Sequence, residues 1–380
     1  MTVASSVRRL AAYNTRGQFT GCIRLTMVGI HASTPDAVLD ALFLPVSDGS
    51  VRLPADGRVL FLRARHGYRL CEVAQPGWLC EQSFKPFADA LMRDGFIVGD
   101  ATPDARFSLV LVLPPRQREE ARALFARAAR HAEGGGVVLA CVPNAEGAKS
   151  AQADLSALLG SVSHLSKHKC RVFWGVSEMP VGDSSLRDAW LAFDTPQDNA
   201  AGFLSRPGLF AWDRADTASA LLAAHLPNDL RGHIADFGAG YGYLAAQIVE
   251  RCPHVTAIDL YEAEARALEP ARLNMERAVR ESGRTLSFDV HWHDVTTGID
   301  RRYDAIVSNP PFHQGRADLP DLGRAFIARA ANALVSPGRL WLVANRHLPY
   351  EATLAAHFEH VDTVVTQDGF KVIEARGVRG

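Results

Sequence analysis

The sequence lacks the features expected of a secreted, metal-binding or membrane protein. Its six cysteines are scattered along 380 residues, and none forms a C-x-x-C pair. We therefore expect neither a disulfide framework nor a zinc site, and no other metal. No apolar run approaches the ~20 residues of a membrane-spanning helix. The first 18 residues contain three arginines but no apolar stretch of the kind that a secretory signal needs, so we expect a cytoplasmic protein.

A large excess of either charge is also missing. The formal net charge is −1, with 47% hydrophobic and 22% charged residues, a composition typical of globular proteins. Any surface that binds nucleic acid would therefore have to be a local patch rather than a field over the whole protein. The chain is too long for one core of ordinary size, which predicts two domains.

One order of elements occurs twice along the chain. Each copy has a strand ending at a Pro-Pro pair, then a helix, then a second strand, predicted at residues 107–113, 119–131 and 137–142 and again at 303–308, 322–334 and 340–344. We interpret this order as an internal duplication of about 180 residues. The alternative is two unrelated α/β units that share a common order of strands and helices.

The two copies differ at the positions where chemistry is expected. The first copy has Leu113 where the second has Asn309, and no glycine-rich loop follows the strand predicted at residues 59–62, where the sequence continues Arg63-Ala64-Arg65. We therefore predict two tandem α/β domains, at residues 1–195 and 200–380, of which only the second keeps a cofactor site. Five arginines of the first domain could form an RNA-binding patch or a solvated helix face, namely Arg116, Arg118, Arg122, Arg127 and Arg130.

An unusual turn follows the strand at residues 303–308. Pro310 and Pro311 lack an N–H group and have a fixed φ, so the strand must stop there. The turn presents Asn309 at the carboxyl end of the strand, the edge where open α/β sheets bind ligands. Asn309 and the Pro310 carbonyl offer acceptors for both N–H groups of a nucleobase amine, and Phe312 offers a ring for stacking. Such a turn could orient an amine towards an electrophilic methyl group, and the alternative is a loop without catalytic role.

A glycine-rich loop precedes this turn along the chain. Residues Asp236 to Gly242 follow the pattern D-x-G-x-G-x-G between an apolar strand and a helix. Gly238 and Gly240, with Ala239 between them, allow a tight turn and a close approach of the backbone to a ligand. Dinucleotide-binding enzymes have a similar loop. The carboxylate of Asp236, however, would repel a pyrophosphate and suits the ammonium group of a methionine moiety.

Further polar residues follow the next predicted strands. Asp259 ends a strand about 20 residues after the loop, where a carboxylate can bind the ribose hydroxyls of either NAD or S-adenosylmethionine. Asp294 follows the third strand. Asp236, Asp259, Asp294 and Asn309 thus follow four successive strands, and this ordered set is more specific than any one motif.

The turn carries a family resemblance. Asn309-Pro310-Pro311-Phe312 resembles the N-P-P-[FY] motif of class I S-adenosylmethionine-dependent amino-methyltransferases, and with Ser308 and His313 it resembles the ribosomal RNA guanine-N2 methyltransferases of the RsmC/RlmG type. Residues 207–210 and 344–350 resemble that family's P-G-[VL]-F and A-N-x-x-L-P-Y segments. The resemblance implies two Rossmann-like methyltransferase domains. The first would be degenerate and support folding and substrate binding, and the second would have a seven-stranded, mostly parallel sheet.

The resemblance also implies the chemistry. It implies methyl transfer from S-adenosyl-L-methionine to the N2 amine of a guanine in ribosomal RNA, with small-subunit (16S) RNA the expected substrate. In this interpretation Asn309, Pro310 and Phe312 are catalytic, and Asp294 accepts a hydrogen bond from the adenine amine. The full set of expected cofactor contacts is Asp236, Gly238, Ala239, Gly240, Asp259, Asp294 and Asn309. The candidate contacts to RNA phosphates are Arg316, Arg346 and Lys371.

The sequence leaves other functions open. Methylation of adenine N6 or of a protein glutamine would use the same turn. A non-catalytic RNA-binding or ribosome assembly factor would not need the complete set of residues in the second domain. A dehydrogenase is least favoured, because the Asn-Pro-Pro-Phe turn would then lack a role. We expect a monomer that acts on ribosomal RNA or a ribosomal subunit.

Overall fold

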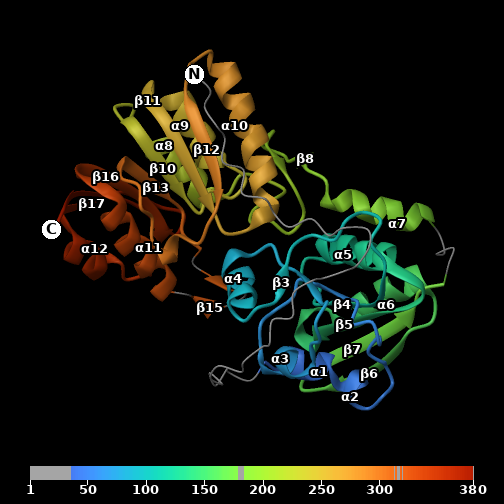
Figure 1. Cartoon of the computed structure of the whole chain (residues 1–380). Helices are drawn as coiled ribbons and strands as arrows, with labels where there is room; N and C mark the ends of the chain where they lie inside the picture. The colour runs from blue at the N-terminus through green and yellow to red at the C-terminus, as the bar shows by residue number, and fades with distance from the viewer. Residues whose placement is uncertain (1–35, 179–183, 312, 315–316, 319, 380) are drawn as a thin grey trace, which may run out of the picture.

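The computed structural model describes residues 36–178, 184–311, 313–314, 317–318 and 320–379. The described chain forms two lobes, which Figure 1 colours blue to green and yellow to red. The strands of the first lobe are β1 (Val59–Leu62), β2 (Leu79–Glu81), β3 (Ile97–Val98), β4 (Phe107–Val112), β5 (Ala132–Pro143), β6 (Ser163–Lys167) and β7 (Cys170–Val176). Those of the second are β10 (Arg231–Phe237), β11 (His254–Glu262), β12 (Ser287–Trp292), β13 (Tyr303–Ser308), β16 (Leu334–Asn345), β17 (Phe358–Gln367) and β18 (Phe370–Val378).

Both lobes have the same sheet topology. The strand order is β3-β2-β1-β4-β5-β7-β6 in the first sheet and β12-β11-β10-β13-β16-β18-β17 in the second. All neighbours pair in parallel except β7 and β18, which run antiparallel to both of their neighbours. The predicted duplication and the single antiparallel strand are therefore confirmed. Two short ribbons lie outside the sheets, formed by β8 (Gln197–Asp198) with β9 (Leu204–Ser205) and by β14 (His313–Gln314) with β15 (Ala317–Asp318).

Helices cover both faces of each sheet. Those of the first lobe are α1 (Ala37–Leu42), α2 (Leu44–Ser47), α3 (Tyr68–Val73), α4 (Lys85–Arg93), α5 (Arg118–His131), η1 (Asn144–Glu146), α6 (Ala148–Leu159), α7 (Ser184–Leu191) and η2 (Ala192–Asp194). Those of the second are α8 (Thr217–His225), α9 (Tyr243–Arg251), η3 (Ala265–Ala267), α10 (Leu268–Ser282), η4 (Val295–Thr297), α11 (Pro320–Ala333) and α12 (Glu351–His357). No helix in the described part of the chain is long and apolar enough to cross a membrane.

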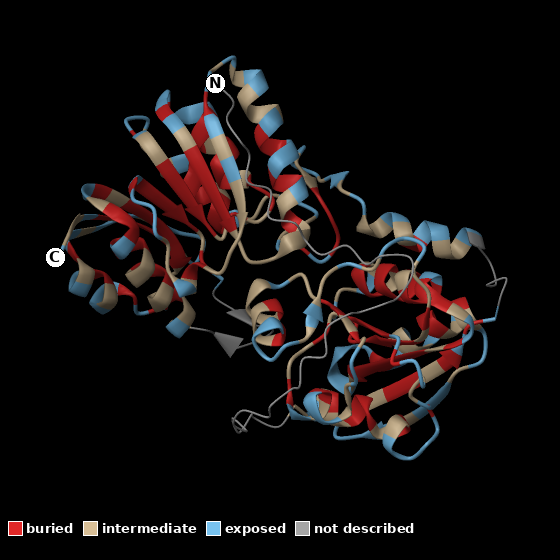
Figure 2. Cartoon of the chain, in the orientation of Figure 1, coloured by how far each residue is buried: buried red, intermediate tan, exposed pale blue. Residues whose placement is uncertain are grey.

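The core of the second lobe has two halves, one on each face of its sheet. Leu222 of α8, Ile248 of α9 and Met275 of α10 are buried on one face. Ile327 of α11 and Leu354 of α12 are buried on the other. Figure 2 shows the buried strands between these layers. Because both faces are covered, the central parallel strands contain buried apolar runs, such as residues 305–307 of β13.

Two segments differ from the local sequence pattern. The strand predicted at residues 340–344 is longer than expected, because α11 ends at Ala333 and β16 begins at Leu334, so Pro337-Gly338 lies inside β16. The pairing of β13 with β16 shifts register at this point, which accommodates the extra residues. The end of the first predicted domain is helical and contains α7. Its Trp190 is buried beneath the guanidinium of Arg122, 4.9 Å from the ring centroid.

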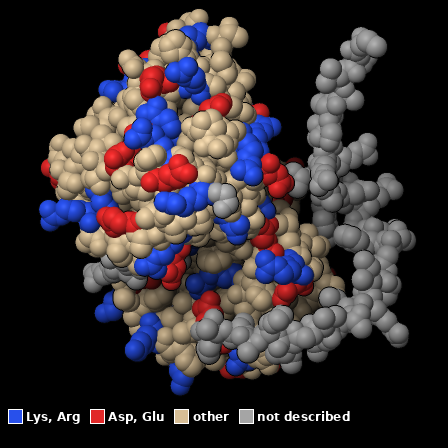
Figure 3. Space-filling view, turned by 90° about the vertical axis from the view of Figure 1, so that its left-hand side faces the viewer, with Lys and Arg blue, Asp and Glu red and all other residues tan. Residues whose placement is uncertain are grey.

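The surface carries no large patch of one charge on the face shown in Figure 3. Lys and Arg side chains there lie among Asp and Glu side chains. This mixture agrees with the overall net charge of −1. On this face, an RNA contact would rest on a few cations rather than on a broad basic patch.

Candidate active site

The site lies at the carboxyl edge of the second sheet. In the register of the sheet, Phe237 of β10 lies beside Tyr261 of β11 and beside Ser308 of β13. The next residue along each strand therefore lies at the same edge of the sheet. These residues are Gly238, Glu262 and Asn309, so the edge brings together a glycine loop, a carboxylate and an amide.

The glycine loop turns sharply between β10 and α9. Gly238 and Gly240 have φ values of 75° and 54°, in the left-handed region that favours glycine. The N–H groups of Gly238 and Ala239 both donate to the Tyr261 carbonyl, at 2.9 and 3.1 Å. A side chain at Gly240 would meet no atom of the described residues within 4 Å, whereas one at Gly238 would lie 3.9 Å from the Asn309 carbonyl oxygen. The loop thus has open space beside it and borders the Asn309 turn.

Asp236 lies beneath this loop and is fully buried. Its Oδ2 accepts a hydrogen bond from the Ala245 N–H at 3.1 Å, at the start of α9. Its Oδ1 has no hydrogen-bond partner among the described residues. Burial raises the pKa of Asp236 to about 7, since the carboxylate has lost its hydration and gains back little. An unpaired buried oxygen of this kind is matched to a cationic or N–H donor from outside the chain.

Glu262 is the carboxylate that leaves β11 at the site. Its Oε2 accepts from the Gly240 N–H at 2.8 Å, and its Oε1 accepts from the Glu264 N–H at 2.8 Å. These two bonds hold the side chain against the glycine loop. Burial raises the pKa of Glu262, and the backbone N–H groups partly offset that effect. A carboxylate has about four acceptor positions, so two remain for a ligand.

Asp259 is placed differently from the sequence prediction. It lies three residues before the end of β11, level with Ala235, and is 2% exposed. Its Oδ2 accepts from Arg301 and from the Tyr303 hydroxyl, both at 2.6 Å. Burial alone would raise the pKa of Asp259, but the neighbouring His291 side chain and the hydrogen bonds from Tyr303 and Arg301 lower it below its ordinary value. Its oxygens are thus occupied within the protein, and the register does not support Asp259 as the ribose ligand.

Asp294 reaches the same edge two residues after β12. Its Oδ1 accepts from the backbone N–H and the hydroxyl of Thr296, at 2.9 and 2.7 Å, and caps the helical turn η4. Capping this turn is thus one role of Asp294, beside the expected contact to an adenine amine. The cap leaves Oδ2 for another donor, so the two roles do not exclude each other.

The amide of Asn309 has a fixed orientation. Its Nδ2 donates to Asp216 Oδ2 at 3.0 Å and to the Ser219 hydroxyl at 2.8 Å. Asp216 caps the N-terminus of α8 by accepting from the Ser219 N–H at 2.8 Å, which fixes its own position. A carboxylate can only accept, so the nitrogen of Asn309 must face Asp216 and Oδ1 must face away from it. Asn309 therefore presents a preoriented acceptor, and the supporting pair lies 93 residues away in sequence, where no local pattern could reveal it.

Comparisons with known proteins show the family of this chain. Residues 200–374 match the sequence family described as the methyltransferase small domain. A "Ribosomal RNA small subunit methyltransferase C" from Shewanella pealeana is 31% identical over 76% of this chain and 82% of its own length. One from Pseudomonas paraeruginosa is 30% identical over 85% of this chain and 92% of its own length. This chain belongs to the ribosomal RNA small subunit methyltransferase C family.

A solved structure shares the fold of this family member. It is described as the T. thermophilus 16S rRNA N2 G1207 methyltransferase (RsmC) in complex with AdoMet and guanosine. The two chains superpose with a TM-score of 0.71 at 24% identity, over 90% of this chain and 92% of that one. The two-lobed methyltransferase fold that the sequence predicted is therefore confirmed.

The cations that were expected to contact RNA differ in their exposure to solvent in this methyltransferase C family member. Lys371 is buried, donates to the Leu348 carbonyl at 2.8 Å and pairs with Glu351, so it stabilises the turn after β16 and does not reach a surface substrate. Arg346 is exposed at the carboxyl edge, where a phosphate could reach it. Arg316 and Phe312 lie outside the described residues.

The five arginines in and just before α5 form neither an unpaired basic patch nor a fully solvated helix face. Arg118 and Arg122 both pair with Asp154, at 3.0 and 3.1 Å, and Arg127 pairs with the buried Glu81. Three of the five arginines therefore neutralise acidic residues of their own lobe. The other two, Arg116 and Arg130, are exposed.

Proposed function

We propose that this protein transfers a methyl group from S-adenosylmethionine to the exocyclic N2 amine of a guanine in small-subunit ribosomal RNA. The observation that carries the proposal is the Asn309 amide, whose oxygen is directed away from Asp216 at the sheet edge. The relatives named above are methyltransferases of small-subunit ribosomal RNA. The related T. thermophilus structure is described with AdoMet and guanosine, which supports the choice of cofactor and base.

The residues beside the glycine loop fit S-adenosylmethionine. Open space adjoins Gly240, a buried oxygen of Asp236 is unpaired, and Glu262 keeps acceptor capacity. We assign Asp236 to the ammonium group, directly or through water, Glu262 to the ribose hydroxyls in place of Asp259, and Asp294 to the adenine amine. The backbone of Gly238, Ala239 and Gly240 lies against the ligand. When bound, the cofactor supplies an electrophilic sulfonium methyl group.

The catalytic step is assigned to Asn309 and the Pro310 carbonyl. Together they accept both N–H groups of a guanine amine that has been turned out of its stack. This holds the lone pair towards the methyl group and stabilises the positive charge that grows on nitrogen as the N–C bond forms and the S–C bond breaks. The spare proton leaves to solvent after transfer, so no strong base is required. Phe312 is assigned to stacking on the base.

We extend the proposal to the role of the first lobe, the substrate, the location and the oligomeric state. We assign the first lobe to substrate binding and folding support, with domain limits at residues 1–195 and 200–380. The substrate is ribosomal RNA or a ribosomal subunit, and the proposed location is the cytoplasm. In this proposal, the protein acts as a monomer and needs no metal.

The experiment is single-turnover methyl transfer to small-subunit RNA with labelled cofactor. We expect Asn309→Ala to lower the rate about 10²-fold, the scale of losing one preorganised polar group. The dissociation constant for S-adenosylmethionine should change little, because Asn309 acts on the transition state. A variant that transfers at the wild-type rate would remove Asn309 from the mechanism.

A further inference from the structure

The first lobe touches the second immediately after Glu262. The Lys85 N–H donates to the Ala263 carbonyl at 2.8 Å, and the Ala265 N–H donates to the Ser83 carbonyl at 2.8 Å. These bonds are backbone bonds, and they flank an antiparallel bridge. Residues 263–265, which follow the proposed ribose ligand Glu262, are therefore paired with the first lobe rather than with the sheet of the second lobe.

Trp292 joins the same contact from the next strand. It is the last residue of β12, and its indole N–H is shared between the Ser83 carbonyl at 2.9 Å and the Ala263 carbonyl at 2.8 Å. The Lys85 ammonium lies 5.3 Å from the centroid of its ring, a cation–π distance. The first lobe thus contacts the loop after β11 and the end of the strand that leads to Asp294.

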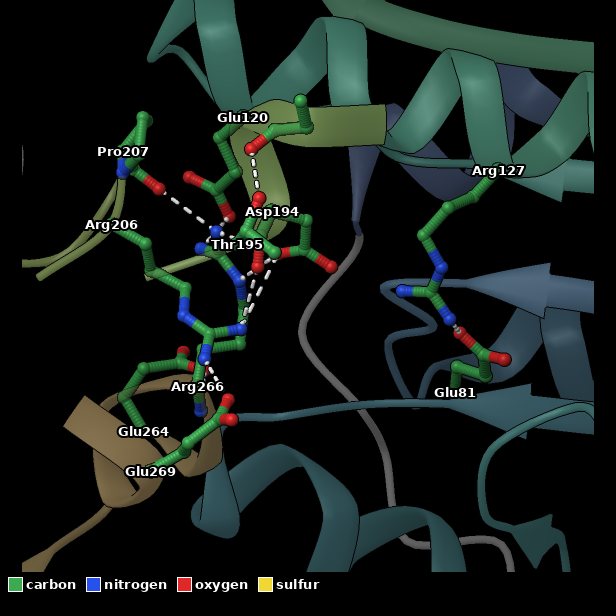
Figure 4. Close-up of polar contacts among 11 residues, drawn as sticks. Glu81, Glu120, Arg127, Asp194, Thr195, Arg206, Pro207, Glu264, Arg266 and Glu269 are labelled. Atoms are coloured by element: carbon green, nitrogen blue, oxygen red, sulfur yellow. Dashed lines mark hydrogen bonds and ion pairs between the residues drawn. The ribbon is translucent and has the colours of Figure 1, made fainter. Parts of the chain in front are cut away.

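A buried ion pair makes a second contact between the lobes, at the helical turn η3 that follows Ala263. Glu120 of α5 is 10% exposed in its side chain and lies 2.9 Å from Arg266 Nη1 in η3. The same guanidinium donates to the Pro207 carbonyl at 2.8 Å and contacts Asp194 Oδ1 at 3.2 Å. Figure 4 shows these side chains converging on Arg266 from three separate segments.

The fit around this ion pair is close. A side chain at Gly208 would put its Cβ 2.1 Å from Glu120 Oε2, so only glycine is compatible with this approach. Arg206 extends the network by donating to Glu269 at 2.5 Å and to the Asp194 carbonyl at 2.9 Å. Removing Glu120 would leave Asp194 as the remaining acidic partner of Arg266, which weakens the attachment of the segment that carries Arg266 to α5.

We propose that the first lobe holds the cofactor-binding loop of the second lobe in its binding geometry, with the Lys85 N–H and the Glu120 carboxylate as positioning groups. This rests on the proposed function, which places the cofactor beside Glu262. Residues 263–266 follow Glu262 directly, so fixing them fixes the direction in which its carboxylate leaves β11. The lobe that lacks a glycine loop therefore acts on the cofactor site of the other lobe. RNA that engages both lobes would then tighten cofactor binding, and cofactor would tighten RNA binding by the same factor.

The first test removes one N–H group. Lys85→Pro deletes the donor to Ala263 and places a ring carbon against that carbonyl. Proline is tolerated at the first position of a helix, and Phe84 before it is already extended. Lys85→Ala loses the same side chain but keeps the N–H and is the reference. We expect Lys85→Pro to bind S-adenosylmethionine about 3- to 30-fold more weakly than Lys85→Ala by calorimetry, the range typical of coupling networks.

The second test uses the carboxylate. Glu120→Ala should weaken binding of S-adenosylmethionine over a similar range, and Glu120→Gln should recover part of the loss, because the amide oxygen can still accept from Arg266. The control is Asp154→Asn, which disturbs the ion pairs of Arg118 and Arg122 on the same helix but not the contact between the lobes. Asp154→Asn weakens ion pairs within the first lobe, but it should leave the dissociation constant for the cofactor unchanged.

Hydrogen exchange supplies a measurement that does not need the cofactor. In the ligand-free protein, the Ala265 amide should exchange faster in Glu120→Ala and Lys85→Pro than in Asp154→Asn. Equal dissociation constants and equal Ala265 exchange rates in all folded variants would overturn the proposal while leaving the proposed function intact. If wild-type protein does not bind S-adenosylmethionine, the proposed function itself fails, and the two failures are thereby distinguished.

Discussion

The contact between Asn309 and Asp216 makes Asn309→Asp an informative change. The variant would place two carboxylates about as far apart as Nδ2 and Oδ2 are now, 3.0 Å. With an effective dielectric constant of about 20, their repulsion is about 5 kcal/mol. Protonating one of them at pH 7 costs about 4 kcal/mol, roughly 1.4 kcal/mol for each pH unit above an ordinary pKa near 4. The pair will therefore take up a proton, and its folded-state pKa will be raised.

The sign of the pH effect follows from this shift. A carboxyl group with a raised pKa in the folded state stabilises the fold below its ordinary pKa, and that contribution is lost as the pH rises through the folded value. The free energy of unfolding of Asn309→Asp should thus fall relative to wild type between about pH 5 and 7. Turnover should be 10²-fold lower or more at pH 7, on the scale of a lost polar group.

The double variant Asn309→Asp with Asp216→Asn tests the reason for the loss. It restores an amide opposite a carboxylate with the two groups exchanged, but the oxygen of Asp216 that faces Asn309 also caps α8, so the exchanged amide loses one of these two contacts. We expect the double variant to regain part of the turnover at pH 7, with Asp216→Asn alone as the control. Single-turnover methyl transfer and urea unfolding measure the two effects. A double variant no better than Asn309→Asp would refute the orientation assigned to Asn309.

Two further predictions concern the cofactor, and calorimetry checks both. Glu262→Gln should weaken S-adenosylmethionine binding by about 10- to 100-fold, the scale of hydrogen bonds to a charged group. Asp259→Asn should lower stability with little change in affinity for the cofactor. A larger loss of affinity in Asp259→Asn than in Glu262→Gln would restore Asp259 as the ribose ligand. Because burial raises the pKa of Asp236 to about 7, affinity should rise about tenfold from pH 5.5 to 7 as its carboxylate ionises. Asp236→Asn should bind weakly and without that rise, and a similar rise in the variant would remove Asp236 from the ammonium site.

The sequence was sufficient for the order of the strands and for the turn at Asn309. The apolar run before Pro310 predicts β13 within a residue, since two prolines leave no other place for the strand to end. The repeated order of strand, helix and strand predicts two sheets of one topology. These features depend on local physical rules, which a single sequence contains.

Other features could not be predicted because they depend on register and distant contacts. The strand β11 continues for three residues past Asp259, because Leu260 and Tyr261 pair with β10 and are buried. Glu262 therefore takes the edge position, and only the apolar character of those two residues indicated a longer strand. Lys371 resembled a surface cation, yet the turn after β16 folds over it. The support of Asn309 by Asp216 exists only in three dimensions.

The most direct test of the account is the identity of the methylated nucleoside. Small-subunit ribosomal RNA would be incubated with the protein and labelled S-adenosylmethionine, digested to nucleosides and analysed by mass spectrometry. The account predicts label in N2-methylguanosine, at a level that falls about 10²-fold in Asn309→Ala during the linear phase. Label in N6-methyladenosine, in protein glutamine or in no product at all would contradict it.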